Sequence, residues 1–330
     1  MRTVAQPGLA GAPPNFRFVR IGATSGIDAD EVLEGLSRTQ KSLPAKLLYD
    51  ARGSELFNAI CETEAYYPTR TERAIFLEHA GAMAEAIGAD SVIVEPGSGE
   101  MSKVRMLLPA LRPSAYVGMD VSEKQLISAG TRLAADYAEL DVLAVCGDFG
   151  RLDAVSPHVP AASKRVAFFP GSTIGNLDPA RAREFLSVLF NLVGDDGVAI
   201  VGVDLRKAKA VLDLAYNDPE GYTRAFNLNL LTRLNRDLGG DFDERRFQHH
   251  AFYDEARGRI EMHLVSMVAQ KVRIANREIT FAPGESIHTE SSYKYEPQAF
   301  AALAGEAGFE TQRLWTDARE YFGVFLLARN

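Results

Sequence analysis

The sequence predicts an α/β protein whose core is a doubly wound, mainly parallel β-sheet with an antiparallel hairpin at its C-terminal edge. Through the middle of the chain, short apolar runs of strand length alternate with helical stretches. Continuous apolar strands separated by helices are typical of a parallel sheet that is buried on both faces. Because crossovers between parallel strands are right-handed, this alternation leads to a doubly wound fold.

Strands and helices can be assigned from this pattern in chain order. The apolar runs predict parallel strands at residues 91–95, 115–120, 141–146, 165–169 and 197–203. Helical stretches between and after them lie at residues 103–111, 123–140 and 179–192. Two later strand-like runs, 308–315 and 321–328, are joined only by the short link TDARE, so we expect an antiparallel pair. A parallel sheet that ends in such a hairpin is the class I methyltransferase variant of the Rossmann-like fold.

Residues 207–294 interrupt the alternation and predict an inserted α+β domain. A long helix is expected at 223–237, and short alternating runs follow, separated by turn residues, at 248–252, 259–268, 271–274 and 278–281. We expect this insertion to pack with residues 16–69 as a substrate-binding domain. Residues 70–206 and 295–330 would then form the catalytic domain, and residues 1–15 a disordered leader.

The composition argues against several classes of partner. The chain carries 36 basic and 44 acidic residues, a formal net charge of −8, and no basic block stands out. An acidic protein repels phosphate backbones, so no nucleic-acid partner is expected. No stretch reaches the roughly 18 apolar residues of a membrane helix, and the first residues do not resemble a signal peptide. We therefore expect a cytoplasmic monomer that binds a small molecule, without a membrane partner.

Cysteines and histidines give no sign of a metal site. Cys61 and Cys146 offer neither a disulfide framework nor the spacing of metal ligands, which fits a reducing cytoplasm. The six histidines are scattered, and the adjacent His249 and His250 would point to opposite faces of a strand. We expect no bound metal.

A glycine-containing turn follows the first predicted strand, in the string Glu-Pro-Gly97-Ser-Gly99. Glycines at this position let the backbone turn tightly and approach a ligand. The third glycine of a full dinucleotide-binding fingerprint is missing, because Ser102 occupies its place. Turns of this kind also occur without a ligand, so the turn alone is a weak signal.

Acidic residues at the ends of the next two strands strengthen the case for a nucleoside cofactor. Asp120 ends the second strand, 21 residues after Gly99, where a carboxylate can accept hydrogen bonds from both ribose hydroxyls. Asp148 and Phe149 follow the third strand, where the acid can accept from an adenine amino group while the ring packs on the base. The alternative is that both aspartates merely cap helices. Three such elements at consecutive strand ends favour cofactor binding.

The choice between nicotinamide dinucleotide and S-adenosylmethionine depends on the remaining features. The glycine turn and Asp120 would suit either cofactor. The Asp148–Phe149 pair and the closing hairpin favour S-adenosylmethionine. Glu100, directly after the turn, would repel a pyrophosphate but not a sulfonium. We therefore expect S-adenosylmethionine.

Several strings match one family in the same order along the chain. They are LLYDARGSELFNAI, YYPTRTE, EPGSGEMSK, FFPGSTIGNLD, LAYND, RIEMHL, ESIHTESSYKY and DAREYFGVFLLAR. From about Lys41 to the C-terminus the chain therefore resembles the histidine-specific methyltransferases of ergothioneine biosynthesis. The resemblance implies that the α-amino group of L-histidine is trimethylated to hercynine with S-adenosylmethionine as methyl donor.

The resemblance also implies roles for individual residues. It places around the cofactor Tyr49, Gly97, Lys103, Asp120, Asp148 and Phe149, to which the glycine turn adds Gly99. Asn176 and Tyr216 are implied to hold the substrate carboxylate, and Tyr66 to lie near the amine and the imidazole. Glu290 and Ser292 are implied to bind the imidazole, and Met262 to line the ring.

These residue types suit the chemistry, although each has a plainer alternative. Amide and phenol donors hold a carboxylate without adding a charge, and an acid beside a hydroxyl can specify the two nitrogens of an imidazole. Asn176 could instead be a turn residue, Met262 a core residue and Glu290 a solvated surface acid. Of the adjacent Tyr66 and Tyr67, we expect one to pack and Tyr66 to act in the site.

The catalytic step needs a free amine lone pair, and no strong base is obvious from the sequence. We expect water or the hydroxyl of Tyr49 or Tyr66 to relay the proton. Two other functions stay open: methylation of another amino acid such as a tryptophan derivative, and cofactor binding without catalysis. Glu290 and Ser292 argue against an indole ring, which has one donor and no acceptor. A non-catalytic binder would not need Asn176, Tyr216 and Glu290 together.

Overall fold

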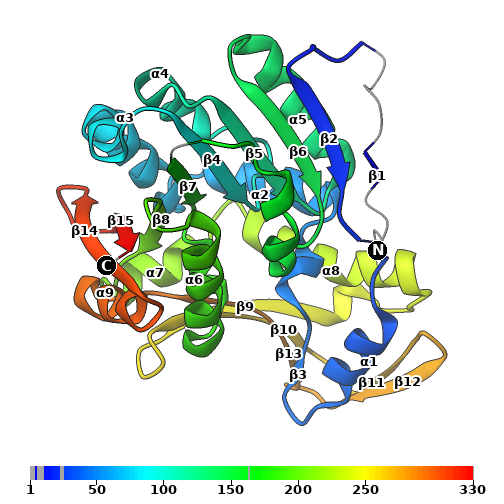
Figure 1. Cartoon of the computed structure of the whole chain (residues 1–330). Coiled ribbons are helices and arrows are strands. Elements are labelled where there is room, and N and C mark those ends of the chain that lie inside the picture. The colour runs from blue at the N-terminus through cyan, green and yellow to red at the C-terminus, as the bar shows by residue number, and fades with distance from the viewer. Residues whose placement is uncertain (1–3, 6–10, 23–25, 163, 330) are drawn as a thin grey trace.

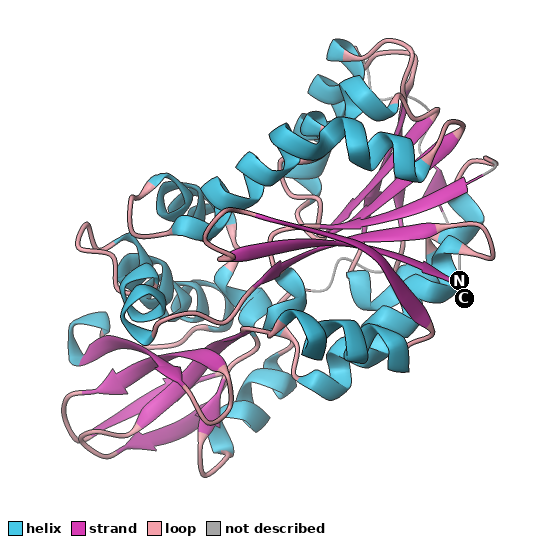
Figure 2. Ribbon diagram, turned by 90° about the vertical axis from the view of Figure 1, so that its left-hand side faces the viewer, coloured by secondary structure: helices cyan, strands magenta, loops and turns pink. Residues whose placement is uncertain are grey.

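The computed structural model describes residues 4–5, 11–22, 26–162 and 164–329, without the side chains of residues 4, 5, 149 and 151. Within this part of the chain the strands form a nine-stranded sheet, a four-stranded sheet and a two-stranded hairpin. Figure 2 shows helices on both sides of the large sheet, with the smaller sheets at its lower left. The two larger sheets define the two regions that meet at the candidate site.

The large sheet has the predicted doubly wound topology. Its parallel strands run, in spatial order, β2 (Phe16–Arg20), β6 (Asp141–Cys146), β5 (Ala115–Asp120), β4 (Ser91–Pro96), β7 (Lys164–Phe169) and β8 (Val198–Asp204). The antiparallel strands β15 (Phe322–Arg329) and β14 (Phe309–Thr316) close the edge beside β8. The predicted fold class is therefore confirmed. The strand order reverses at β4, so a crevice is expected at the carboxyl ends of β4 and its neighbours.

Helices cover both faces of this sheet and form two separate core layers (Figure 1). One layer contains side chains of α3 (Tyr67–Ile87), α4 (Leu108–Leu111) and α5 (Glu123–Asp136). The other contains side chains of α6 (Pro179–Val193) and α9 (Pro297–Glu306). The helix predicted at 103–111 is instead a short 3₁₀ turn, η2 (Val104–Met106), followed by α4. Pro109 lacks the N–H that a continuous helix would need there.

The second region is built on the four-stranded sheet in the order β3 (Lys41–Ser42), β13 (Ser286–Tyr293), β10 (Arg259–Ser266) and β9 (Phe247–Asp254). The hairpin strands are β11 (Gln270–Ile274) and β12 (Arg277–Phe281). The helices of this region are α1 (Ala29–Ser37), α2 (Ala51–Glu62), α7 (Lys209–Ala215) and α8 (Tyr222–Leu238). They share one apolar core with the sheet, in which α8 packs on both α2 and β9.

The structure corrects the expected course of the N-terminal residues. We assigned residues 16–69 to the second domain, but β2 pairs in parallel with β6 and so belongs to the large sheet. Phe16 and Phe18 are buried in the core layer beneath α5, which explains the difference. Of the expected leader, residues 1–3 and 6–10 lie outside the described residues, whereas β1 (Val4–Ala5) pairs with β2. Asn15 donates to three carbonyl oxygens at the end of α5 and the turn after it.

No helix in the described ranges is both long enough and apolar enough to cross a membrane.

Phe325 of β15 tests how much the closing hairpin contributes to stability. Its ring is 1% exposed and lies 4.7 Å from the ring of Phe300 in α9. Phe325→Ala should lower the free energy of unfolding by about 3–5 kcal/mol, because it leaves a cavity in this layer. The matched control is Leu314→Ala on β14, directly opposite Phe325 but 37% exposed, which should cost less than about 1 kcal/mol. Urea denaturation measures both, and equal losses would contradict the packing described here.

Candidate functional site

The glycine turn after β4 borders open space at the carboxyl edge of the large sheet. Gly97 and Gly99 have φ angles of 70° and 49°, in the region that favours glycine. The turn is held because Ser98 N donates to Met119 O at 2.9 Å. A Cβ atom at Gly99 would meet nothing within 4 Å. The backbone of this turn can therefore be approached closely by a bound molecule, as a nucleoside cofactor requires.

Asp120 lies directly beside this turn at the end of β5. Its carboxylate accepts hydrogen bonds from Gly99 N at 3.0 Å and from Ser122 N at 2.9 Å. Burial raises the pKa of Asp120, although these backbone donors oppose the shift. Each oxygen accepts one of these bonds and keeps a further lone pair, so the carboxylate can still accept from a pair of hydroxyls.

Asp148 follows β6 and caps the 3₁₀ helix η3 (Phe149–Ala154) by accepting from Gly150 N at 2.8 Å. This is the capping role given above as its alternative, and the side chain is otherwise exposed. The side chain of Phe149 lies outside the described part of the structure. The roles of Asp148 and Phe149 at an adenine therefore stay predictions.

Lys103 is fixed by a buried acid that the sequence analysis did not select. Its Nζ lies 2.7 Å from Glu72 Oε2, and Glu72 Oε1 accepts from Gly171 N at 2.6 Å. Nearby, burial raises the pKa of Glu95 to about 8, and the hydroxyl of Tyr116 donates to its carboxyl at 2.5 Å. Glu95 could have been selected from the sequence, because it stands at the start of the glycine turn.

Asn176 and Glu290 meet although 114 residues separate them in the chain. Asn176 ends the 3₁₀ helix η5 (Thr173–Asn176) after β7, and Glu290 lies on β13. Asn176 Nδ2 donates to Glu290 Oε1 at 3.1 Å. Gly175 permits this approach, because a Cβ atom there would lie 2.7 Å from the carbonyl oxygen of Tyr293.

Tyr216 and Ser292 form a second pair beside the first. Tyr216 is the residue after α7, and its hydroxyl donates to Ser292 Oγ at 2.9 Å. Both residues are buried, at 7% and 5% exposure. Four residues implied to bind substrate thus come together from three separate segments of the chain.

Glu290 is a second acid, after Glu95, whose ionisation is clearly disfavoured in the site. Burial raises its pKa to about 7, although Lys294 and the hydrogen bond from Asn176 oppose the shift. Met262 lies directly opposite Glu290 across the β10–β13 pair and is 1% exposed in the core of the second region. Directly opposed residues share a face of a sheet, so Met262 borders the same space while also serving as a core residue.

Tyr49 and Tyr66 complete an aromatic wall around these groups. The ring of Tyr49 packs edge-on against Phe226, and that of Tyr66 against Tyr216, at 5.3 Å and 6.0 Å between centroids. Burial raises the pKa of both hydroxyls, and the charge of Glu290 adds to each shift. Both phenols therefore keep their protons at neutral pH.

Tyr67 points away from these residues, toward a buried cluster of charged side chains that was not predicted from the sequence. Its hydroxyl donates to Asp204, which ends β8 and is 0% exposed. Lys207 and Lys294 bind the same carboxylate at 2.6 Å and 2.7 Å. Asp204 carried the same signal as Asp120, since it directly follows an apolar strand, and Lys294 lies inside the ESIHTESSYKY string.

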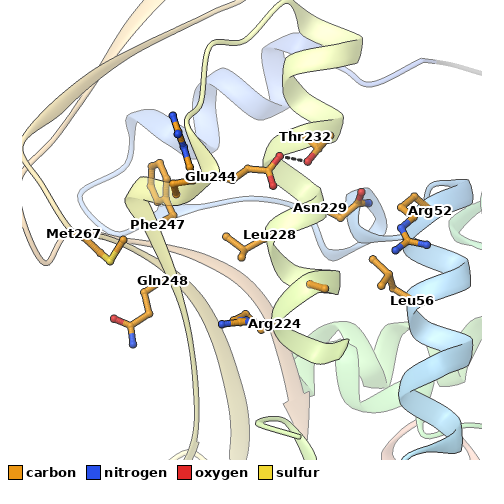
Figure 3. A pocket seen from close by; sticks show the side chains of 12 residues that line it. Arg52, Leu56, Arg224, Leu228, Asn229, Thr232, Glu244, Phe247, Gln248 and Met267 are labelled. Atoms are coloured by element: carbon orange, nitrogen blue, oxygen red, sulfur yellow. Dashed lines mark hydrogen bonds between the residues drawn. The ribbon is translucent and has the colours of Figure 1, made fainter. Parts of the chain in front are cut away.

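A hollow of about 770 Å³ lies elsewhere on the second region, between α2, α8 and the start of β9. Figure 3 shows its lining, which includes Arg52, Arg224 and Phe247 and none of the predicted site residues. Among the described residues, no group of three or more histidine, cysteine, aspartate or glutamate side chains is arranged to hold a metal ion.

Comparisons with known proteins agree on one family. The family model described as histidine-specific methyltransferase, SAM-dependent, matches residues 28–329. Histidine N-alpha-methyltransferase of Mycolicibacterium smegmatis is 42% identical over 305 residues, which cover 91% of this chain and 94% of that protein. The protein of the same name from Mycobacterium tuberculosis is 41% identical with the same coverage. Ergothioneine biosynthesis protein 1 of Neurospora crassa is 31% identical over 88% of this chain and 33% of that longer protein.

The raised pKa of Glu290 predicts an unusual effect on stability. The folded protein holds this proton more tightly than the unfolded chain, whose carboxyl has a pKa near 4.5. Ionisation of Glu290 therefore destabilises the fold as the pH rises from about 4.5 through 7. Glu290→Gln should raise the free energy of unfolding at pH 8 by about 1–3 kcal/mol and change it little at pH 4.5.

Glu261, equally buried on β10, is the matched control. Burial alone would raise its pKa, but hydrogen bonds from Arg259 and His263 lower it to about 2. Its ionised form therefore stabilises the fold above pH 4.5, and Glu261→Gln should destabilise the protein at pH 8. Chemical denaturation at both pH values measures the two variants. A loss of stability at pH 8 in both would contradict the electrostatics described for Glu290.

Proposed function

Because this chain belongs to the histidine-specific, S-adenosylmethionine-dependent methyltransferases, we propose that it methylates the α-amino group of L-histidine. The family predicted from the sequence motifs is thereby confirmed. We further propose that three transfers give the trimethylated betaine, hercynine, as a step of ergothioneine biosynthesis. The enzyme would act as a cytoplasmic monomer, without a nucleic-acid or membrane partner.

The observation that carries this proposal is the meeting of the Asn176–Glu290 and Tyr216–Ser292 pairs. Together the two pairs offer what a histidine side chain and an amino-acid carboxylate need. Asn176 and Tyr216 can donate to the carboxylate, while Glu290 and Ser292 can pair with the two ring nitrogens. When the substrate binds, Asn176 would turn from Glu290 to the carboxylate and leave Glu290 for the ring. Tyr216 would keep its bond to Ser292 and share its proton with the carboxylate.

The cofactor side of the proposal depends on the turn after β4. Bound S-adenosylmethionine would supply an electrophilic methyl group on its sulfonium sulfur. The open backbone at Gly97 and Gly99 would lie against it, and Asp120 would accept from its ribose hydroxyls. Lys103, fixed on Glu72, would lie at the same edge of the sheet. The contribution of this chain is to hold the substrate amine in line with that methyl group.

Recognition of the ring separates histidine from the tryptophan alternative. A buried acid that loses its partner costs about 1–3 kcal/mol or more, so a ring without a matching N–H should bind at least about 10-fold more weakly. An indole could satisfy Glu290 but would leave the donor of Ser292 without an acceptor. Imidazole satisfies both residues.

Proton removal is assigned to the tyrosine hydroxyls or to water. Tyr49 and Tyr66 both keep their protons at neutral pH, so they can pass a proton along but are not standing bases. Their aromatic faces, with that of Tyr216, also provide a surface that suits a growing methylated ammonium group.

Calorimetric titration with S-adenosylhomocysteine present tests the substrate. L-histidine should bind, whereas L-tryptophan and L-tyrosine should not. Glu290→Ala should weaken histidine binding at least about 10-fold because the ring N–H loses its acceptor. Binding of S-adenosylhomocysteine should be unchanged in the variant and serves as the control for folding. Cofactor-product binding without histidine binding would refute the substrate assignment.

Substitution of the tyrosines tests the proton relay. Tyr49→Phe or Tyr66→Phe should lower kcat by about 100-fold and change its pH profile, since proton transfer contributes on that scale. Tyr222→Phe, at an exposed tyrosine of α8, is the control and should leave kcat unchanged. If neither phenol alters the rate or the profile, water alone carries the proton.

A further inference from the structure

Lys294 follows β13 and is a buried residue that contacts two of the proposed substrate-binding residues, Tyr216 and Ser292. Its side chain is 1% exposed. The ammonium nitrogen lies 2.7 Å from Asp204 Oδ2, 2.7 Å from Ser292 Oγ and 3.0 Å from the hydroxyl oxygen of Tyr216. An ammonium group has three N–H donors, so all of them are used inside the protein. Lys294 therefore has no donor left for a substrate.

These contacts fix what the Ser292 hydroxyl can do. An ammonium group can only donate, so both hydroxyl oxygens must accept from it. Ser292 Oγ also accepts from the hydroxyl of Tyr216. A serine oxygen has two lone pairs, and both are now occupied. The remaining capacity of Ser292 is its own proton, which must point to another acceptor.

We propose that Lys294 is a positioning residue that makes Ser292 a hydrogen-bond donor toward the amino-acid substrate. The site then selects a ring with an unprotonated nitrogen at Ser292 and an N–H at Glu290. Neutral imidazole meets both requirements in one tautomer. Imidazolium, indole and phenol rings do not. This inference rests on the proposed function and adds a residue that determines its specificity.

The charge of Lys294 is secured by its surroundings. Burial would lower its pKa, but Asp204 and Tyr216 outweigh burial and raise it. The second lysine on Asp204 differs, since burial lowers the pKa of Lys207 to about 8. The group of one aspartate and two lysines carries a net positive charge. Removing either lysine leaves a neutral Asp204–lysine pair, so both single variants should fold.

The first arm of the test compares Lys294→Met with Lys207→Met, the matched control on the same carboxylate. Histidine is titrated into each protein with S-adenosylhomocysteine present. Lys294→Met should weaken histidine binding by about 10- to 100-fold, because Ser292 can then turn its proton to Tyr216 or another acceptor. Lys207→Met should change histidine binding by less than about 3-fold. Equal effects of the two substitutions would overturn the proposal.

An analogue distinguishes positioning from general damage to the site. The ring of 3-(2-thienyl)-L-alanine offers no N–H and no ring nitrogen. The weak affinity for this analogue should be the same in the wild type and in Lys294→Met. With histidine as substrate, the substitution should raise KM by a larger factor than it lowers kcat. A parallel loss of affinity for both amino acids would show a merely structural role.

A double-mutant cycle with Ser292→Ala tests whether Lys294 acts through this hydroxyl. Residues that act as a unit are not additive, so Lys294→Met should have little further effect on histidine binding in the Ser292→Ala background. Ser291→Ala, on the opposite face of β13, is the control background. In it, Lys294→Met should weaken histidine binding as much as it does in the wild type. Full additivity with Ser292→Ala would show that Lys294 acts through Glu290 or the fold, and would overturn the inference.

The outcomes separate this inference from the proposed function. Wild-type protein that binds S-adenosylhomocysteine but not histidine refutes the proposed function itself. Wild-type protein that binds histidine, with an additive cycle, refutes only the role of Lys294. If Lys294→Met does not fold, Lys294→Gln takes its place in the cycle, because its amide can still donate to Asp204 while its oxygen lets Ser292 turn.

Discussion

The buried carboxylate of Asp204 is the constraint on which the position of the site depends. A lone carboxylate inside a protein is costly, so its partners must be held in place. Those partners are Tyr67 at the start of α3, Lys207 after β8 and Lys294 after β13. The group therefore ties the large sheet to the second sheet. Lys294, held by Asp204, also donates to the hydroxyl oxygens of Tyr216 and Ser292 and so orients these groups. The Asn176–Glu290 pair lies next to them.

The sheet could be predicted because its signal is local. Each buried parallel strand is a short apolar run, and the run itself marks the strand. The N-terminal strand β2 was missed because the string FRFVR alternates and nothing in it says which sheet it joins. β13 was recognised as a motif but not as a strand, since SIHTESSY is polar. Its buried polar side chains are Thr289, Glu290 and Ser292. They bond to Asn227, Asn176 and Tyr216, which lie far away in the chain, and a single sequence does not reveal such partners.

Single residues at strand ends and within the family strings could be predicted, whereas the pairing of buried charges could not, even where both partners carry such a signal. Asp120 and Glu290 were selected on such grounds. Asp204 and Lys294 are 90 positions apart and become partners only in the folded chain. Tyr66 and Tyr67 were distinguished by the structure, which places the first against Tyr216 and the second against Asp204. The roles of Asp148 and Phe149 remain predictions of the sequence.

A crystal structure of the protein with S-adenosylhomocysteine and L-histidine would test the central claim most directly. One ring nitrogen should lie within hydrogen-bond distance of Glu290 and the other within hydrogen-bond distance of Ser292, with Lys294 still bonded to that serine. The substrate carboxylate should lie at Asn176 and Tyr216, with the amine facing the sulfur. A histidine bound with its ring away from β13, or a Ser292 hydroxyl that still donates within the protein, would contradict the account.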